Sequence, residues 1–228
     1  MLSKAGLGSR TQARSWIHGG RVKVNGKVVE NPDLWIDFAR DKVLFDGKPL
    51  RAQRRVYLLL HKPTGYITTF KDPEGRPTVY DLIPELETFV SPVGRLDLDT
   101  SGLLILTNDT QFAERLTNPE HQVPKTYLVK CADLLSDEAL ARLRDGVGLS
   151  DGPTKPARVR RIRDSEIELT ITEGRNRQVR RMVEAVGSKV LELMRTAIGP
   201  VPVGDLPIGA SRELTAVELR ALGLTPPR

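Results

Sequence analysis

The stretch Gly94-Arg95-Leu96-Asp97-Leu98-Asp99-Thr100-Ser101-Gly102-Leu103-Leu104 places two carboxylates between an arginine and a short polar break. The apolar run that it enters, residues 103–106, predicts a buried strand. A nearby cation favours the ionised form of a carboxylate, and a buried strand holds its neighbours in place. The sequence therefore indicates Asp97 as a candidate nucleophile or base. Asp99 is the rival carboxylate, but its position beside the Thr-Ser-Gly turn favours a structural role.

A second arginine-rich stretch, Glu173-Gly174-Arg175-Asn176-Arg177-Gln178-Val179-Arg180-Arg181-Met182, follows an alternating segment at 166–172 that predicts a strand. We expect a helix over 176–186, and a helix N-terminus carries partial positive charge. Three arginines lie within one turn of one another: Arg177, Arg180 and Arg181. This arrangement suits a phosphate group or a buried carboxylate, whereas the alternative is a solvated helix start.

The charge of the chain is unevenly distributed. The net charge is +6 and the isoelectric point is about 9.6. Residues 1–55 carry 12 Lys and Arg against 5 Asp and Glu, and residues 154–195 carry 11 against 6. Two basic blocks separated by an acidic remainder favour a polyanion that touches the protein in two places. Nucleic acid is the expected partner.

Several classes of protein are disfavoured by composition. The single cysteine, Cys131, has no internal disulfide partner, which is typical of a reducing, cytoplasmic location. Its three histidines are far apart in sequence, so no zinc-like spacing occurs and no metal is expected. No apolar run approaches the ~18 residues that span a membrane. The N-terminus does not read as a secretion signal.

The first 47 residues read as a small separate module. Ser9 to Gln12 forms a capping box, which predicts a helix running to about His18. Asn25-Gly26 between alternating segments predicts a two-residue hairpin turn, and a further short strand is expected over 42–45.

Three basic side chains of this module are candidates for RNA contact. Arg10 and Arg14 lie one helical turn apart on one face. Lys23 alternates with two valines, so it is expected to point away from the apolar side. The helix-plus-hairpin pattern resembles the alpha-L RNA-binding module, which implies recruitment of RNA.

The rest of the chain reads as a basic linker, 48–55, followed by one α+β domain, 56–228. Strands outnumber crossover helices, which favours an antiparallel or mixed sheet. We expect strands at 56–60, 103–106, 125–130, 166–172 and 190–196, and helices at 109–116, 136–144, 176–186 and from 215.

Four segments in order resemble the motifs of RNA pseudouridine synthases, and with the N-terminal module they resemble the RsuA/RluB branch. They are Gly94 to Asp97, Lys125 to Tyr127, Glu173 to Met182, and Leu193 to Gly199. The resemblance covers essentially the whole chain. It implies that a uridine in ribosomal RNA is detached at its N-glycosidic bond, rotated and rejoined through carbon, with no cofactor.

The resemblance also implies roles for individual residues. Asp97 is the indispensable carboxylate, which attacks C1′, attacks C6 or removes the 2′ proton; the sequence leaves these three open. Arg180 pairs with Asp97, with Arg177 as the alternative. Tyr127 packs on the target base and assists proton transfer.

The remaining contacts to substrate follow from the same resemblance. Leu193 is the second apolar wall, and Arg95 fills the gap left by the flipped uridine. Arg177 and Arg181 are further cations that are expected to bind substrate.

The target RNA stays open at this point. The string Asp72-Pro73-Glu74-Gly75-Arg76-Pro77 resembles one in RluB-like enzymes, which favours 23S rRNA of the large subunit. A 16S rRNA enzyme of the RsuA type and a noncatalytic RNA-binding assembly factor are the alternatives. A nucleoside hydrolase would need a metal or a second acid, which the sequence lacks. A monomer is expected.

Overall fold

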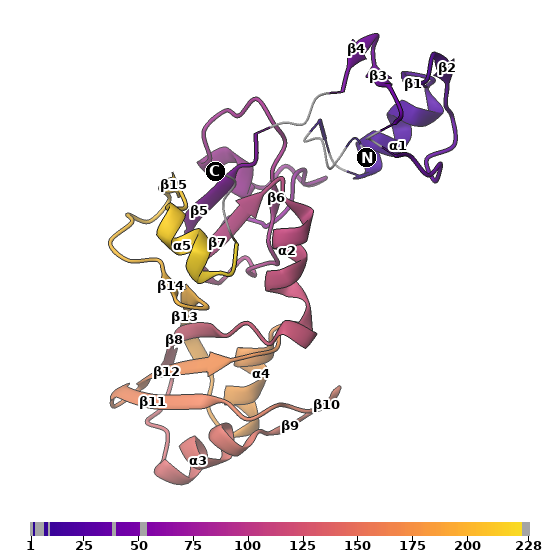
Figure 1. The fold of residues 1–228 in the computed structure, drawn as a ribbon. Coiled ribbons are helices and arrows are strands. Elements are labelled where there is room, and N and C mark those ends of the chain that lie inside the picture. Colours follow the sequence, from indigo (N-terminus) through magenta and orange to yellow (C-terminus); the bar gives the residue numbers. More distant parts are fainter. Residues whose placement is uncertain (1, 3–6, 9, 38–39, 51–53, 225–228) are drawn as a thin grey trace. The chain divides into compact units, whose positions relative to one another are not determined.

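The computed structural model describes residues 2, 7–8, 10–37, 40–50 and 54–224 (Figure 1). Its helices are α1 (Arg10–His18), α2 (Thr110–Thr117), α3 (Asp137–Asp145), α4 (Gln178–Ala185) and α5 (Ala216–Ala221), with 3-10 turns η1 (Val79–Leu82) and η2 (Pro119–His121). None of the helices in this part of the chain is long and apolar enough to cross a membrane.

The strands of the described residues fall into separate sheets. They are β1 (Val22–Val24), β2 (Lys27–Val28), β3 (Val43–Phe45), β4 (Lys48–Pro49), β5 (Tyr57–Lys62), β6 (Ser91–Pro92), β7 (Ser101–Thr107), β8 (Lys125–Cys131), β9 (Gly148–Leu149), β10 (Gly152–Pro153), β11 (Arg158–Arg163), β12 (Glu166–Ile171), β13 (Val190–Ile198), β14 (Val201–Pro202) and β15 (Ser211–Glu213).

The chain divides into two compact units. The smaller unit holds residues 1–57 together with 85–91 and 107–110, and the larger unit holds the remaining residues. The expected limits of the module (1–47), the linker (48–55) and the catalytic domain (56–228) remain a prediction.

The smaller unit contains a four-stranded sheet in the order β2-β1-β3-β4. Asn25 and Gly26 both have positive φ, 51° and 86°, as a type I′ hairpin requires. Helix α1 ends at His18 as expected, whereas the capping residue Ser9 lies outside the described residues. Lys48 and Pro49 form β4, whose backbone pairs with β3 across the Asp46-Gly47 turn.

The core of the smaller unit lies between α1 and its sheet. Val22 is completely buried while its neighbour Lys23 is exposed, which confirms the predicted alternation. Ala13 and Ile17, one turn apart on α1, pack in the same cluster. One apolar face of the helix therefore covers the strands.

The larger unit is built on a mixed sheet whose main order is β11-β12-β8-β13-β7-β5-β15. β8 and β12 are neighbouring antiparallel strands, but β13 pairs parallel with β7, through Met194 with Ser101 and Arg195 with Gly102. The expectation of an α+β fold with a mixed sheet is confirmed. Sequence reasoning missed the edge strand β11, because its pattern Arg-Val-Arg-Arg-Ile-Arg carries few apolar residues.

Helices α3 and α4 pack on one face of this sheet. Leu140 and Leu143 of α3 and Met182 and Val183 of α4 are at most 2% exposed and share one apolar cluster with the sheet. Figure 1 shows both helices beside β8 to β12. The packing fixes α4, and with it the arginine-rich segment, against the sheet.

Candidate active site

A cavity of about 390 Å³ lies in the larger unit beside the Asp97 segment. Its polar lining includes Arg95 and Asp97 before β7, Lys125 and Tyr127 on β8, Arg195 on β13, and Glu173 and Asn176 before α4. Ligand pockets typically enclose ~300–1,000 Å³, so the cavity is large enough for a small ring. These motifs, far apart in sequence, thus meet at one cavity.

The wall formed by β8 and β13 follows from strand register. Tyr127 lies directly opposite Arg195, and directly opposed residues share a face of the sheet. Lys125 is two residues before Tyr127 on the same strand, so it presents its side chain on that face as well. The pleat of two strands therefore places one aromatic ring and two cations at the cavity.

Lys62 holds the segment that carries Asp97 through hydrogen bonds to the backbone of that segment. This lysine is completely buried at the end of β5. Its Nζ donates to the backbone carbonyls of Asp97 at 3.0 Å, Thr100 at 2.8 Å and Pro63 at 3.1 Å. Burial lowers its pKa to about 8. Sequence reasoning missed Lys62, although a lysine closing an apolar strand was the available signal.

Gly102 allows β7 to approach β13 closely. Its φ is +108°, and a Cβ there would lie 2.2 Å from the carbonyl oxygen of Arg195. A backbone oxygen has little room to move away, so only glycine fits. The parallel pairing of the two strands brings the Asp97 segment and Arg195 to the same cavity.

The arginines at the start of α4 have partners that differ from the prediction. Arg177 lies 3.7 Å from the Asp97 carboxylate and binds both Asp99 carboxylate oxygens at 3.3 and 3.1 Å. The buried Arg180 contacts Asp99, donating to its carbonyl at 2.9 Å and lying 3.1 Å from its carboxylate. The ion pair at Asp97 is therefore made by Arg177, which was the alternative, and Arg180 anchors the loop through Asp99.

Asp99 itself is a structural carboxylate in this arrangement. Its ion pairs with Arg177 and Arg180 outweigh partial burial and lower its pKa. Asp97 lines the cavity, and its side chain is 34% exposed. The two carboxylates therefore differ in their contacts: Asp99, although its side chain is 48% exposed, is bound by two arginines, whereas Asp97 lines the cavity.

Arg177 adopts a left-handed backbone conformation at the start of α4, with φ 47° and ψ 32°. Residues other than glycine rarely adopt this conformation, and it costs of order 1–3 kcal/mol. The side chain that spans both carboxylates of the loop is therefore held by a strained residue. Such strain is concentrated at functional sites.

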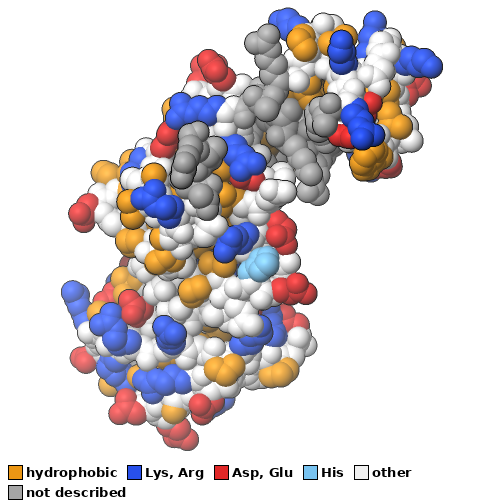
Figure 2. Space-filling view, viewed as in Figure 1, with side chains coloured by type: hydrophobic (Ala, Val, Ile, Leu, Met, Phe, Trp, Pro, Cys, Tyr) orange, Lys and Arg blue, Asp and Glu red, His pale blue; other side chains and the backbone are white. Residues whose placement is uncertain are grey.

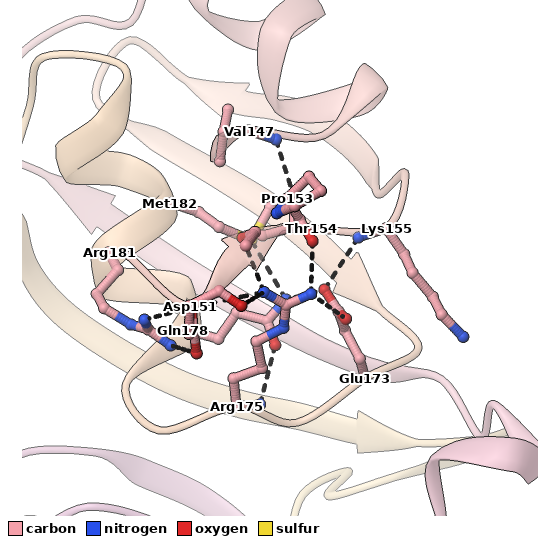
Figure 3. Close-up of polar contacts among 11 residues, drawn as sticks. Val147, Asp151, Pro153, Thr154, Lys155, Glu173, Arg175, Gln178, Arg181 and Met182 are labelled. Atoms are coloured by element: carbon pink, nitrogen blue, oxygen red, sulfur yellow. Dashed lines mark hydrogen bonds and ion pairs between the residues drawn. The ribbon is translucent and has the colours of Figure 1, made fainter. Parts of the chain in front are cut away.

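Arg181 does not lie at the cavity. It binds both carboxylate oxygens of Asp151 at 2.8 and 3.1 Å, in the turn between β9 and β10. Figure 3 shows this ion pair beside Arg175, which donates to the backbone carbonyls of Gly152 and Pro153 in β10. Arg181 thus binds the turn between β9 and β10 where a contact to substrate was expected. The side chains of Arg177 and Arg181 have different partners, Asp99 and Asp151.

Leu193 also lies away from the cavity. It is 6% exposed and packs in the cluster beneath α4, whereas Ile198 lines the cavity. A bulge between Arg195 and Ala197 shifts the register, so that Ile198 rather than Ala197 lies opposite Lys125. Sequence alternation alone would not locate this shift. Ile198, and not Leu193, is thus among the apolar residues that line the cavity.

Two of the three expected RNA contacts of the smaller unit are at its surface. Arg14 is exposed and lies 3.4 Å from Asp33. Lys23 is exposed as well. The side chain of Arg10 lies outside the described residues.

The second basic block, 154–195, does not form a single surface. In the larger unit, Lys and Arg side chains gather over β11 and β12 with acidic ones among them (Figure 2). Arg160 lies 3.2 Å from Glu168, and Arg163 lies 3.7 Å from Glu166. Part of this block thus forms ion pairs with acidic residues of β11 and β12. The arginines at the start of α4 form ion pairs with the Asp97 loop and with the β9–β10 turn.

Two family models match the chain. Residues 56–185 match the model described as RNA pseudouridylate synthase, and residues 1–34 match the S4 domain. A solved structure titled as a pseudouridylate synthase superposes with a TM-score of 0.73 at 35% identity, covering 97% of this chain and 96% of that one.

Curated relatives cover nearly the whole chain. An uncharacterized RNA pseudouridine synthase of Aquifex aeolicus is 42% identical and covers 97% of this chain and 91% of its own. Ribosomal large subunit pseudouridine synthase B of Bacillus subtilis is 40% identical (97% and 93%). Ribosomal small subunit pseudouridine synthase A of Yersinia pestis is 38% identical (94% and 93%). The chain therefore belongs to the RNA pseudouridylate synthase family, in its RsuA/RluB branch, and is an isomerase.

Proposed function

We propose that this protein converts one uridine of 23S rRNA to pseudouridine and that Asp97 is its catalytic carboxylate. The observation that carries the assignment is the position of Asp97, which lines the cavity together with Tyr127 and lies 3.7 Å from Arg177. Asp99 is the weaker candidate, because Arg177 and Arg180 already bind it. The reaction takes place after the uridine leaves its stack and enters the cavity.

The other side chains then take roles that fit their positions. Tyr127 packs against the uracil ring and stands near the C5 proton. Ile198 supplies the opposite apolar contact in place of Leu193. Arg95 is exposed at the edge of the cavity, where it can occupy the space that the flipped uridine leaves. Arg177 orients Asp97, and Arg180 holds the loop.

The choice of 23S rRNA is supported by the segment Asp72 to Pro77 and by the relative from Bacillus subtilis. Arg76 binds both carboxylate oxygens of Asp72, and Asp72 also accepts the backbone N–H groups of Glu74 and Arg76. These bonds lower the pKa of Asp72 to about 2. The segment is thus a pre-organised loop in the larger unit, suited to a fixed RNA shape. Such an enzyme works in the cytoplasm, where ribosomal RNA is transcribed and assembled.

The test is tritium release from 23S and 16S transcripts labelled at uridine C5, with wild type beside Asp97→Asn and Asp99→Asn. Release from 23S by wild type, with none by Asp97→Asn and retained release by Asp99→Asn, is expected. Asn is nearly isosteric with Asp, so RNA affinity should stay within a few-fold.

Each departure from this pattern has a distinct meaning. Release from 16S alone would refute the large-subunit assignment and leave the chemistry intact. Undiminished release by Asp97→Asn would remove Asp97 from catalysis. Binding without release from either transcript, or from partly assembled subunits, would favour a noncatalytic assembly factor.

A further inference from the structure

Two cations lie together on the cavity wall without an acidic partner. Lys125 and Arg195 both line the cavity, from the neighbouring strands β8 and β13. The described part of the chain offers neither of them a carboxylate at ion-pair distance. Burial, and secondarily the charge of Arg195, lower the pKa of Lys125.

Arg195 has an unused hydrogen-bond donor. It is 4% exposed, and its Nε donates to the carbonyl of Leu103 at 2.8 Å. Its Nη2 is buried and has no hydrogen-bond partner among the described residues. A buried donor without a partner destabilises the fold, and more so when it is charged. The folded protein therefore bears a cost at Arg195 that a bound acceptor would remove.

The two carboxylates that line the same cavity are bound by other groups. Asp97 lies beside Arg177. The Glu173 carboxylate accepts from Gln178, Arg175 and the backbone N–H of Lys155, as Figure 3 shows. Neither carboxylate neutralises Lys125 or Arg195. The positive charge on this wall is thus available to a ligand that carries negative charge.

The proposed reaction produces such a charge inside the cavity. When the bond between N1 and C1′ breaks, both electrons stay with the base, and its negative charge is shared by N1, O2 and O4. C1′ is left short of electrons, and Asp97 relieves this deficit either by bonding to C1′ or by taking the 2′ proton. C5 then bonds to C1′ as the bond from Asp97 to C1′ breaks, or as Asp97 returns the 2′ proton to C2′. C5 releases its own proton and N1 takes up a proton, so the product is an isomer of uridine.

We propose that Lys125 and Arg195 bind and stabilise the detached uracil anion during this exchange, through its carbonyl oxygens. The inference rests on the proposed function. It assigns the pair a role at the reacting base rather than at the RNA backbone. Donors that meet charge developing in a closed site lower the reaction barrier more than they strengthen ground-state binding.

The experiment measures single-turnover tritium release at saturating RNA, together with RNA affinity by filter binding in an Asp97→Asn background. The RNA is whichever labelled rRNA transcript the wild type modifies. Lys125→Met should lower the rate at saturation roughly 100-fold, the loss typical of removing one such donor. The dissociation constant should change less than three-fold. Lys125→Arg keeps the charge and should recover most of the rate.

Two further variants make the outcome specific. Lys130→Met is a matched control on the same strand, because Lys130 is exposed and pairs with Glu192, and it should retain the wild-type rate. Arg195→Lys keeps a cation beside the base and should lose rate rather than affinity, with thermal unfolding reporting whether it folds.

Three results would overturn the inference. An unchanged rate in Lys125→Met would exclude a role at the base. Weaker binding with an unchanged rate at saturation, and a shallower salt dependence, would assign the lysine to a backbone phosphate. A wild type without turnover on any rRNA would refute the proposed function itself, and the inference would fall with it.

Discussion

Replacing Gly102 by alanine tests how the Asp97 segment is held against β13. The new Cβ would lie 2.2 Å from the carbonyl oxygen and 2.5 Å from the nitrogen of Arg195. Both atoms belong to the backbone in the centre of the sheet, so the strands must separate. The parallel pairing of Arg195 with Gly102 would be disrupted first.

The expected magnitude has two parts. An L-residue in a left-handed conformation costs about 1–2 kcal/mol, and forcing an extra methyl group into a packed interior costs about 1–3 kcal/mol. Gly102→Ala should therefore lower the free energy of unfolding by about 2–5 kcal/mol. Catalysis should fall further, since Asp97 and the cavity wall are positioned by the same two strands.

Gly152 provides a matched control. Its φ of +104° is close to that of Gly102, but a Cβ there would meet nothing within 4 Å. Gly152→Ala should therefore show the conformational cost alone. Urea unfolding of both variants and the wild type measures the difference, and tritium release measures activity. Equal destabilisation of the two variants would refute the argument that contact with β13 requires glycine at 102.

Three further predictions concern charged residues. Arg10→Ala with Arg14→Ala should weaken RNA binding mainly at higher salt and reduce the slope of log K against log salt by about one for each phosphate that the variant no longer binds; an unchanged slope would remove this helix from the interface. Arg177→Gly relieves the strain of a left-handed backbone and removes only exposed ion pairs. The free energy of unfolding should therefore stay constant or rise by up to about 1 kcal/mol, while turnover drops. A decrease in the free energy of unfolding would contradict the assigned strain. The pKa of Lys62 is about 8 in the folded protein, against an ordinary value of 10.5. Between these two pH values the unfolded chain binds one more proton than the folded chain, so the free energy of unfolding of the wild type should rise with pH relative to that of Lys62→Met. Parallel curves of unfolding free energy against pH for the two proteins would contradict the lowered pKa.

Several elements could be predicted from sequence because their signals are local. The Asn25-Gly26 turn requires two residues with positive φ, and the chain provides residues that tolerate it. Ser136 caps α3, and Thr215 with Glu218 forms the capping box of α5, both through bonds to nearby backbone. Such features depend on a few neighbouring residues, so they can be recognised without knowledge of the fold.

Other features depended on contacts between distant segments. Lys62 acquires its three carbonyl acceptors only when the loop 97–100 folds over the end of β5. Arg177 immediately precedes α4 and Arg180 lies in its first turn, and their spacing in sequence alone does not say which of them reaches Asp97. That choice depends on how α4 packs against the sheet, which the sequence pattern does not encode.

The sequence by itself determined the local elements and the ordered motifs that identify the family, because periodicity, caps and motif spacing are properties of neighbouring residues. Only the tertiary structure decided which side chains meet at the cavity. The bulge in β13 places Ile198 opposite Lys125 at the cavity, and the packing beneath α4 buries Leu193 in the core. The parallel pairing of β13 with β7 brings Arg195 beside the Asp97 segment. Strand register and bulges arise from packing across the whole sheet, and so they follow from the fold rather than from any one segment.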